Sequence, residues 1–399
     1  MTEKPTDTPK ELPFATFVTA LKGLKGLGRT VPGVDRFALV TFAPLVLILF
    51  SALFGGVWAL LALAWVLLGI DLVDRRLPKP APDAPEGAAF PSADTLSKAL
   101  AIAHFGLLMI VVGALAGFAG TGVLSRIALF LAAGIWFGQV SNANAHELIH
   151  RAERSLFALG KWVYITLLFG HHVSAHRLVH HAAVATPQDP ATATLGESFW
   201  AYAPRAWIGG FRAGLEIETA RAAQRKAALG PKPGLKKRIA ALNPYVLYLL
   251  GGSWCVIGAV LFFGWGGLFA YLALCGYAQM QILLSDYVQH YGLMRRQIAP
   301  GQYEPVSEAH SWDATETLSS LFMLNAPRHS DHHAHPMRPY PALQLGDIAA
   351  PGRPILPHSL RVMATLALVP GKWRAMMDER VLGLRKAEAA PQVAPAPQA

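Results

Sequence analysis

The chain has 399 residues, of which 53% are hydrophobic and only 15% are Asp, Glu, Lys or Arg, and its formal net charge is +10. A soluble globular protein carries about 25% charged residues, so the composition excludes an ordinary soluble enzyme. A disordered chain would be polar and poor in aromatic residues, so it is excluded as well. Two Cys are too few for a disulfide framework, a zinc ribbon or an iron–sulfur site. Any metal must bind to other ligands, and the 15 His are the conspicuous candidates.

Six apolar runs approach the roughly 20 residues that a transmembrane helix needs. They form three pairs, and a short Gly-rich turn separates the members of each pair. The runs are Phe37 to Leu53 and Val57 to Ile70, Ala99 to Phe118 and Val123 to Val140, and Tyr245 to Phe263 and Leu268 to Leu284. The sequence therefore predicts an all-α membrane protein with six transmembrane helices arranged as three hairpins.

The basic residues predict how these helices are oriented. The turns inside the hairpins carry almost no Lys or Arg, and Arg126 near the start of the fourth run is the exception. Cytoplasmic loops of membrane proteins carry the Lys and Arg excess, so we expect both termini on the cytoplasmic side of the cell inner membrane. The positive charge is thus first a topology signal. Nucleic-acid binding would need a folded basic module, and the sequence contains none that we recognise.

The order of these features predicts six segments. They are a cytoplasmic segment at 1–36 without a signal peptide, the first four transmembrane helices in 37–144, a cytoplasmic region at 145–244, the last two transmembrane helices in 245–284, a second cytoplasmic region at 285–388, and a disordered Ala/Pro/Gln tail at 389–399. The apolar run Leu156 to Phe169 is short and contains Lys161. We expect it to be a buried or interfacial helix, because it is too short to span.

The histidines cluster in the two cytoplasmic regions. His146-Glu147-Leu148-Ile149-His150 continues from the fourth apolar run, and residues four apart share one face of a helix. Two rings there could bind one metal just beyond the membrane. The same pattern is the HExxH of zinc proteases, in which Glu147 would be the general base.

Three further clusters follow the first. The candidate metal ligands are His146, His150, His176, His180, His181, His290, His329, His332 and His333. Neutral imidazole suits Zn, Cu, Fe and Ni, and one zinc takes about four ligands. Nine rings are too many for one metal and fit two, which disfavours a single-zinc protease. We expect His171, His172, His310 and His335 to be neighbours of the ligands or surface residues.

Four stretches make the sequence resemble the membrane-bound alkane 1-monooxygenase family, within the larger group of membrane di-iron hydroxylases and desaturases. They are His146-Glu147-Leu148-Ile149-His150, His180-His181-Ala182-Ala183-Val184-Ala185-Thr186-Pro187-Gln188-Asp189-Pro190, His290-Tyr291-Gly292-Leu293 and Arg328-His329-Ser330-Asp331-His332-His333-Ala334-His335-Pro336. The resemblance runs from the first apolar run to about Leu382. It implies two non-haem irons held by histidines, and O₂-dependent hydroxylation of an apolar hydrocarbon, an n-alkane giving a 1-alkanol. It also implies electrons from a rubredoxin-type carrier and its NAD(P)H-dependent reductase.

The chain departs from the family pattern beside the ligands. The family has Glu-His-Asn-x-Gly-His-His where this chain has Ala175-His176-Arg177-Leu178-Val179-His180-His181, and Asp286, Gln289 and Asp313 also replace other family residues. Groups beside the ligands orient the rings and tune the metal, so these changes bear on the substrate. A xylene-type monooxygenase acting on methylarenes and a fatty-acyl desaturase or hydroxylase remain alternatives. A transporter is disfavoured because the clusters lie beyond the helix ends.

Other residues are expected to support the metal ligands or the substrate. Asp189, Asp286, Asp313 and Asp331 are the expected hydrogen-bond partners of ring N–H groups. The chain has no evident dinucleotide fingerprint, so electrons should arrive from a partner protein at the cytoplasmic face. In the family a bulky residue on the second span limits how deep the substrate chain reaches, and Trp65 is the closest match.

Overall fold

The computed structural model describes residues 28–389, so most of the predicted N-terminal segment 1–36 and of the predicted disordered tail 389–399 lies outside the described residues. The fold is almost entirely helical, which confirms the predicted class. Within the described residues, the strands form one two-stranded antiparallel sheet, β1 (Gln297–Ala299) and β2 (Gln302–Tyr303).

The helices of the apolar half follow the predicted runs closely. They are α2 (Val34–Phe54), α3 (Gly56–Ala64), the π-helical turn η2 (Trp65–Gly69), α4 (Ile70–Asp74), α5 (Ala93–Leu115), α6 (Val123–Trp136), the π-helical turn η3 (Phe137–Ser141), α7 (Asn142–Ile149) and α13 (Pro244–His290). Five continuous helical stretches among the described residues are long and apolar enough to cross a membrane, and they are Val34–Phe54, Gly56–Asp74, Ala93–Leu115, Val123–Ile149 and Pro244–His290.

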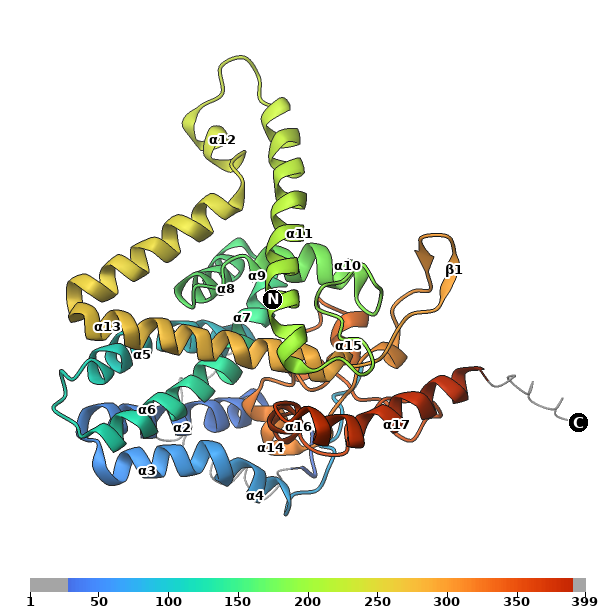
Figure 1. Ribbon diagram of the computed structural model, residues 1–399, viewed down its shortest axis with the longest axis horizontal. Helices are drawn as coiled ribbons and strands as arrows, with labels where there is room; N and C mark the ends of the chain where they lie inside the picture. The colour runs from blue at the N-terminus through green and yellow to red at the C-terminus, as the bar shows by residue number, and fades with distance from the viewer. Residues whose placement is uncertain (1–27, 390–399) are drawn as a thin grey trace, which may run out of the picture.

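The last of these stretches combines the two apolar runs that the sequence predicts as separate spans. Helix α13 has 47 residues, and at 1.5 Å per residue it would be about 70 Å long, more than twice the thickness of a bilayer core. The backbone is not helical at Gly264, where φ is 65° and ψ is −164°. Glycine adopts this conformation without steric cost. Figure 1 shows the resulting two arms of α13, which meet at a bend.

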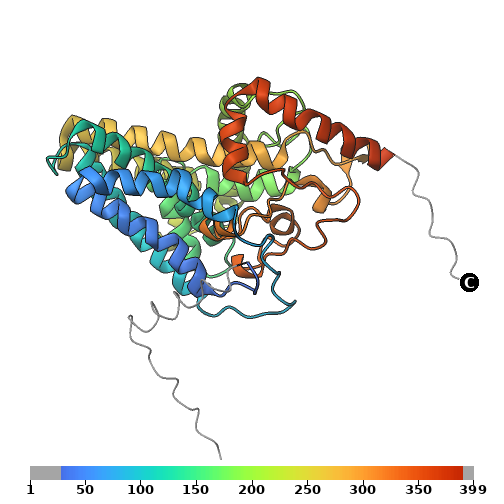
Figure 2. The same ribbon diagram turned by 90° about the horizontal axis from the view of Figure 1, so that it is seen from below.

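The remaining helices lie between and after these stretches in the sequence. They are α8 (Arg154–Thr166), α9 (His172–Ala175), the π-helical turn η4 (His176–His180), α10 (His181–Ala183), α11 (Phe199–Ala227), α12 (Leu235–Ala240), the 3₁₀ turn η5 (Glu308–His310), α14 (Thr317–Phe322), α15 (His329–Ala334), the 3₁₀ turn η6 (Tyr340–Ala342), α16 (Leu360–Ala367) and α17 (Pro370–Ala389). Helix α8 overlaps the predicted short apolar run Leu156 to Phe169, and it is not among the helices long and apolar enough to cross a membrane. Figure 2 shows the apolar helices gathered at one end and α16 with α17 toward the other.

Two acidic residues at the end of the second apolar helix attach the C-terminal region to the bundle. Asp74 accepts hydrogen bonds from the backbone N–H groups of Leu318 and Ser319 at the start of α14. Asp71 accepts one from the hydroxyl of Ser359, the N-cap residue of α16. Carboxylates at helix starts satisfy N–H groups that have no partner within the helix. The starts of α14 and α16 are thereby held against the helix that ends at Asp74.

Small residues on α6 and η3 allow the second arm of α13 to approach closely. A Cβ atom on Gly134 would lie 2.2 Å from Cδ1 of Tyr277, and one on Gly138 would lie 2.4 Å from Cγ of Gln281. Small residues four apart are a common device for packing helices in membranes. This contact fixes α7, which follows η3, beside the end of α13.

We therefore expect Gly134→Ala to destabilise the protein by about 1–3 kcal/mol, the usual cost of overpacking. The added methyl group would collide with the ring of Tyr277. Gly276→Ala is the matched control, because a Cβ there would meet no atom within 4 Å. Thermal unfolding in detergent should show a lower midpoint for Gly134→Ala alone. Equal midpoints for the two variants would contradict the packing described here.

Candidate metal centre

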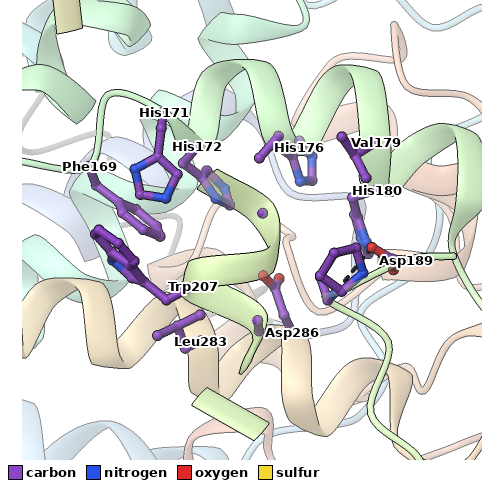
Figure 3. A pocket seen from close by; sticks show the side chains of 15 residues that line it. Phe169, His171, His172, His176, Val179, His180, Asp189, Trp207, Leu283 and Asp286 are labelled. Atoms are coloured by element: carbon purple, nitrogen blue, oxygen red, sulfur yellow. Dashed lines mark hydrogen bonds and ion pairs between the residues drawn. The ribbon is translucent and has the colours of Figure 1, made fainter. Parts of the chain in front are cut away.

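Four segments that are far apart in the sequence bring the nine predicted rings together. The first follows η3 and supplies His146 from α7 and His150 at its end. The second is the helical stretch through α9, η4 and α10, part of which Figure 3 shows facing α13. The third is the last residue of α13, His290, and the fourth is α15. Their convergence depends on the packing of α6 and η3 against α13.

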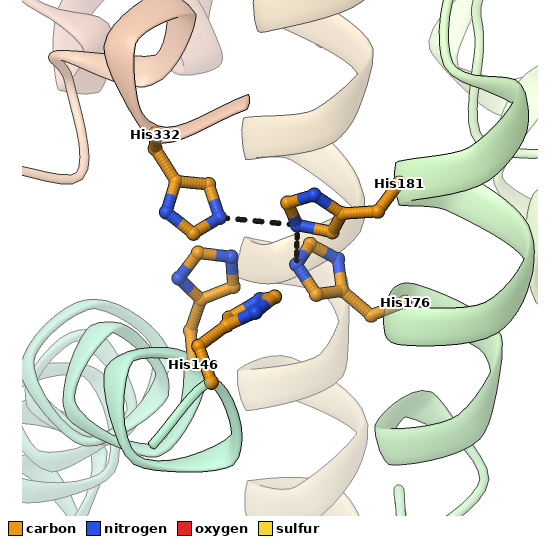
Figure 4. A group of neighbouring side chains, drawn as sticks. His146, His176, His181 and His332 are labelled. Atoms are coloured by element: carbon orange, nitrogen blue, oxygen red, sulfur yellow. Dashed lines mark hydrogen bonds between the residues drawn. The ribbon is translucent and has the colours of Figure 1, made fainter. Parts of the chain in front are cut away.

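The nine rings fall into two groups. The five-histidine group consists of His146, His150, His176, His181 and His332. The four-histidine group consists of His180, His290, His329 and His333. Within each group, every residue offers a ring nitrogen within 4.8 Å of the others. Figure 4 shows how rings of the five-histidine group converge from three helical segments.

A π-helical turn decides which ring joins which group. His176 to His180 form η4, so the chain here follows an i→i+5 repeat. The Nε2 atoms of His176 and His181, five residues apart, lie 3.0 Å from each other. His180 faces the other group, where its ring centroid lies 4.8 Å from that of His290. The single π turn therefore lets one short segment serve both groups.

The nitrogens inside each group approach one another as closely as hydrogen-bonded atoms do. Nε2 of His329 lies 3.0 Å from Nε2 of His290 and 3.1 Å from Nε2 of His333. Nδ1 of His290 faces the carbonyl oxygen of His310 at 3.3 Å. A carbonyl only accepts, so Nδ1 carries the proton and Nε2 of His290 presents a lone pair. Lone pairs that converge in this way fit a bound cation.

Asp189 prepares His180 for the same role. Its carboxylate lies 2.8 Å from Nδ1 of His180, and it also accepts a hydrogen bond from the hydroxyl of Thr192. Nε2 of His180 is buried without a hydrogen-bond partner, as are Nε2 of His146 and Nε2 of His150. Buried polar atoms are nearly always satisfied. These orphaned nitrogens, which are common metal donors, indicate that the residues present fit a metal centre.

Burial keeps most of these rings neutral. It lowers the pKa of His176, His181 and His332 well below the ordinary value, and charge on neighbouring rings would lower it further. The pKa values of His329 and His333 are lowered for the same reasons. Metal binding to histidine requires the neutral ring. Protons therefore compete weakly for these nitrogens near neutral pH.

His180 is the exception among the buried rings. Burial disfavours its charged form, but the adjacent Asp189 carboxylate outweighs this effect and raises the pKa of His180. A carboxylate that accepts the N–H of a ligating histidine fixes the ring and increases its basicity. Asp189 therefore has the geometry of a residue that orients a metal ligand.

The other predicted aspartates contact different partners. Asp313 accepts hydrogen bonds from the backbone N–H and the hydroxyl of Ser330 and pairs with Arg353. It thus holds the start of α15. Asp331 pairs with Arg338 and with the exposed His335. These two carboxylates fix the backbone around α15, whereas we expected them to bind the ligand rings themselves.

The fourth aspartate and two histidines surround a small cavity beside the rings. Asp286 lines it together with His171 and His172, and Trp207 closes it on the side of α11 (Figure 3). The cavity has a volume of about 30 Å³. His310, by contrast, bonds to the backbone N–H of Ser307 and lies outside both groups.

Two further residues bear on rival interpretations. Glu147 forms an ion pair with Arg151 at 2.9 Å and lies 3.3 Å from the backbone N–H of Tyr340, which donates to it. These contacts hold the Glu147 carboxylate against Arg151 and the backbone of Tyr340. The ring of Trp65 lies over Gly69 of its own helix, at 2.7 Å from where a Cβ would be. Its role in limiting substrate length stays a prediction.

Sequence reasoning missed a second cavity next to the rings. It is lined by one ring of each group, His146 and His329, and by the apolar side chains of Ile282 and Met323. Gln139 of η3 also lines it. Gln139 lies inside the predicted fourth apolar run, Val123 to Val140, and sequence reasoning did not single it out. Its place beside the rings depends on residues far along the chain, such as Ile282 and His329, which line the same cavity.

The chain resembles known proteins over much of its length. Residues 121–364 match the family model "Fatty acid desaturase". An alkane 1-monooxygenase of Acinetobacter baylyi is 33% identical over 264 residues, which is 65% of this chain and 60% of that protein. Alkane 1-monooxygenase 1 of Pseudomonas aeruginosa is 32% identical over 276 residues, which is 69% of each chain. Alkane 1-monooxygenase 1 of Alcanivorax borkumensis is 33% identical over 263 residues, which is 65% of this chain and 61% of that protein.

The fold, with its helices of membrane-spanning length and its two histidine groups, is that of a membrane-bound metalloprotein. The chain belongs to the alkane 1-monooxygenase family, within the broader fatty acid desaturase family whose model it matches. The aligned part covers 60% of the length of the Acinetobacter relative, so the chain spans less than two thirds of that protein.

We expect Asp189→Asn to weaken metal binding by roughly 10–100-fold, the usual effect of losing such a partner. The neutral amide can no longer accept the N–H of His180 as a carboxylate does. Asp347→Asn is the control, because Asp347 caps an exposed turn at Ala349. Titration of the metal-free protein with Fe²⁺ should separate the two variants. Equal affinities would show that Asp189 does not orient a ligand.

Proposed function

We propose that the protein uses O₂ to hydroxylate the terminal methyl group of n-alkanes, giving 1-alkanols, at a non-haem di-iron centre. The observation that carries this proposal is the pair of adjacent histidine groups, one of five residues and one of four. The relatives named alkane 1-monooxygenase support the reaction and the substrate class. The helices of membrane-spanning length support a substrate that is taken from the bilayer.

The number and type of the ligands support two metal ions and favour iron as the metal. A structural or catalytic zinc takes about four ligands in tetrahedral geometry, and five rings in one group exceed that number. Imidazole suits iron, and the described ligand groups contain no thiolate. We assign one iron to the group around His332 and one to the group around His333. When bound, the irons would supply the activation of O₂.

The protein's own residues would hold the metals and position the substrate. The nine rings would bind the two metals, and Asp189 would fix the orientation of the His180 ring through its Nδ1 atom. The cavity lined by His146, His329, Ile282 and Met323 is partly apolar and would hold the reacting methyl group. Such walls exclude water and favour alkyl groups by about 0.8 kcal/mol for each buried CH₂.

We also propose six membrane crossings arranged as three hairpins, with the histidines and both termini on the cytoplasmic side. The break at Gly264 supports two crossings by α13, and the distribution of Lys and Arg supports the orientation. A rubredoxin-type protein, reduced by an NAD(P)H-dependent reductase, would supply the electrons from that side. The inner membrane is the corresponding location.

The family model supports one other candidate, a fatty-acyl desaturase or hydroxylase. It would use the same kind of metal centre on an acyl chain. The products distinguish the two functions, because a desaturase yields an unsaturated acyl chain and an alkane hydroxylase yields an alkanol. A xylene-type enzyme would yield benzyl alcohols from methylarenes.

Purified protein loaded with iron should contain about two irons per chain, given that the nine ligands divide into two sets. With O₂, NADH, a rubredoxin and its reductase, it should convert n-alkanes to 1-alkanols, which gas chromatography detects. His332→Ala should lose one iron and its activity, because the five-histidine group becomes incomplete. His335→Ala, which removes an exposed neighbouring ring, should retain both.

Three outcomes would contradict the proposal. About one zinc per chain, with no bound iron, would favour a hydrolase. Unsaturated acyl products without alkanols would favour the desaturase. Full activity of His332→Ala would remove that ring from the ligand set.

A further inference from the structure

A large groove lies on the flank of the helix bundle, away from the metal ligands. It runs between the second apolar helix, α6, the second arm of α13, and α16, and its volume is about 760 Å³. Leu68, Leu72, Val362 and Val369 line it and are also substantially exposed. Leu68 and Leu72 belong to the helical stretch Gly56–Asp74, which is long and apolar enough to cross a membrane, whereas Asp71, Arg75, His358 and Lys372 also line the groove. A hydrocarbon dissolved in the bilayer could therefore enter the groove sideways.

The groove and the cavity at the metal ligands meet at one side chain. Gln139 lines the groove on one side and, on the other, the cavity of about 50 Å³ that contains His146 and His329. Its position is fixed because it belongs to η3, the π-helical turn that follows α6. Any passage from the groove to these two rings through this wall must pass Gln139.

Three polar side chains close this wall, and we call them the latch: Gln139, Gln281 and Arg361. Nη1 of Arg361 donates to Oε1 of Gln139 over 2.6 Å, and Nε2 of Gln139 donates to Oε1 of Gln281 over 3.0 Å. The other terminal nitrogen of Arg361 donates to the carbonyl oxygen of Val66. The latch thus connects α16 to α6–η3 and to α13.

The latch is built around a buried charge. Arg361 has 7% of its surface exposed, and Nε of its guanidinium lies 3.7 Å from a carboxylate oxygen of Asp71. A buried guanidinium costs free energy unless its hydrogen bonds are made. Both of its hydrogen-bond partners belong to π-helical turns, Val66 to η2 and Gln139 to η3. Such turns occur frequently at functional sites. Apolar residues of similar size would join the helices without this cost.

We propose that the latch controls the passage of linear alkyl chains from the groove to the metal ligands. This inference rests on the proposed function, since it takes the substrate to be an alkane. Rotation of the Gln139 amide opens the wall without any movement of the backbone. An unbranched chain then passes end first, whereas a ring or a branched chain requires Gln281 and Arg361 to move as well. The latch thereby selects for linear substrates.

Photolabelling tests the latch without relying on turnover. Iron-loaded protein in detergent is irradiated with an alkyl diazirine, either linear or carrying a cyclohexyl group, and labelled peptides are identified by mass spectrometry. Met280 and Met376 report on the groove, and Ala143 and Met323 report on the inner cavity. In the wild-type protein the linear probe should label both sets, and the cyclohexyl probe should label the groove alone.

Shortening the latch should admit the cyclohexyl probe. In Gln281→Ala, which loses one latch hydrogen bond, and in Gln139→Ala, which loses two, its labelling of the inner cavity should rise roughly five-fold or more. Gln279→Ala is the matched control, because Gln279 lies on the same helix and bonds instead to Trp207 and to the carbonyl oxygen of Leu167. Iron content and the thermal midpoint, measured on each variant, distinguish opening of the wall from unfolding.

The outcomes separate this inference from the proposed function. Inner-cavity labelling by the cyclohexyl probe in wild-type protein would overturn the latch, as would an equal rise in Gln279→Ala. No rise in either latch variant would overturn it too. If the labelling follows the expected pattern but no alkanol is formed, the hydroxylase assignment fails while control of access by the latch stands.

Discussion

Ring nitrogens that face one another at hydrogen-bonding distance are the interaction on which this structure depends. Nε2 of His329 lies 3.0 Å from that of His290, and Nε2 of His181 lies 3.0 Å from that of His176. Burial disfavours protonation of such rings, so a proton cannot readily relieve every contact. A metal cation can, because each neutral nitrogen then donates its lone pair. We therefore expect metal binding to stabilise the packing of the four segments as well as to enable chemistry.

The membrane bundle supplies the rigid frame that this centre needs. Gly134 and Gly138 let α6 and η3 approach α13, and so place His146 beside the segment that ends at His290. Asp74 and Asp313 hold α14 and α15 through backbone hydrogen bonds. Ligands carried by helices that are fixed in this way keep their geometry when substrate enters. The latch residue Gln139 belongs to the same frame. The contact of α6 and η3 with α13 therefore both positions the metal ligands and carries the residue that controls access to them.

Sequence reasoning predicted the parts of this protein that follow from local patterns. Six apolar runs predicted the helices, and spacing within clusters predicted the nine rings that the structure brings together. It did not predict which ring joins which group, because η4 is a π turn and pairs His176 with His181. An α-helical repeat would pair His176 with His180. The contact of Arg361 with Gln139 joins residues 222 positions apart and leaves no local pattern in the sequence.

Anomalous diffraction at the iron absorption edge tests the central claim most directly, because it locates each metal without any assumption about activity. Crystals of the iron-loaded protein should give two peaks, one among the five rings that include His332 and one among the four that include His333. The peaks should weaken together when data are collected below the iron edge. A single peak shared by both groups, or peaks that persist below the iron edge, would contradict the assignment of one iron to each group.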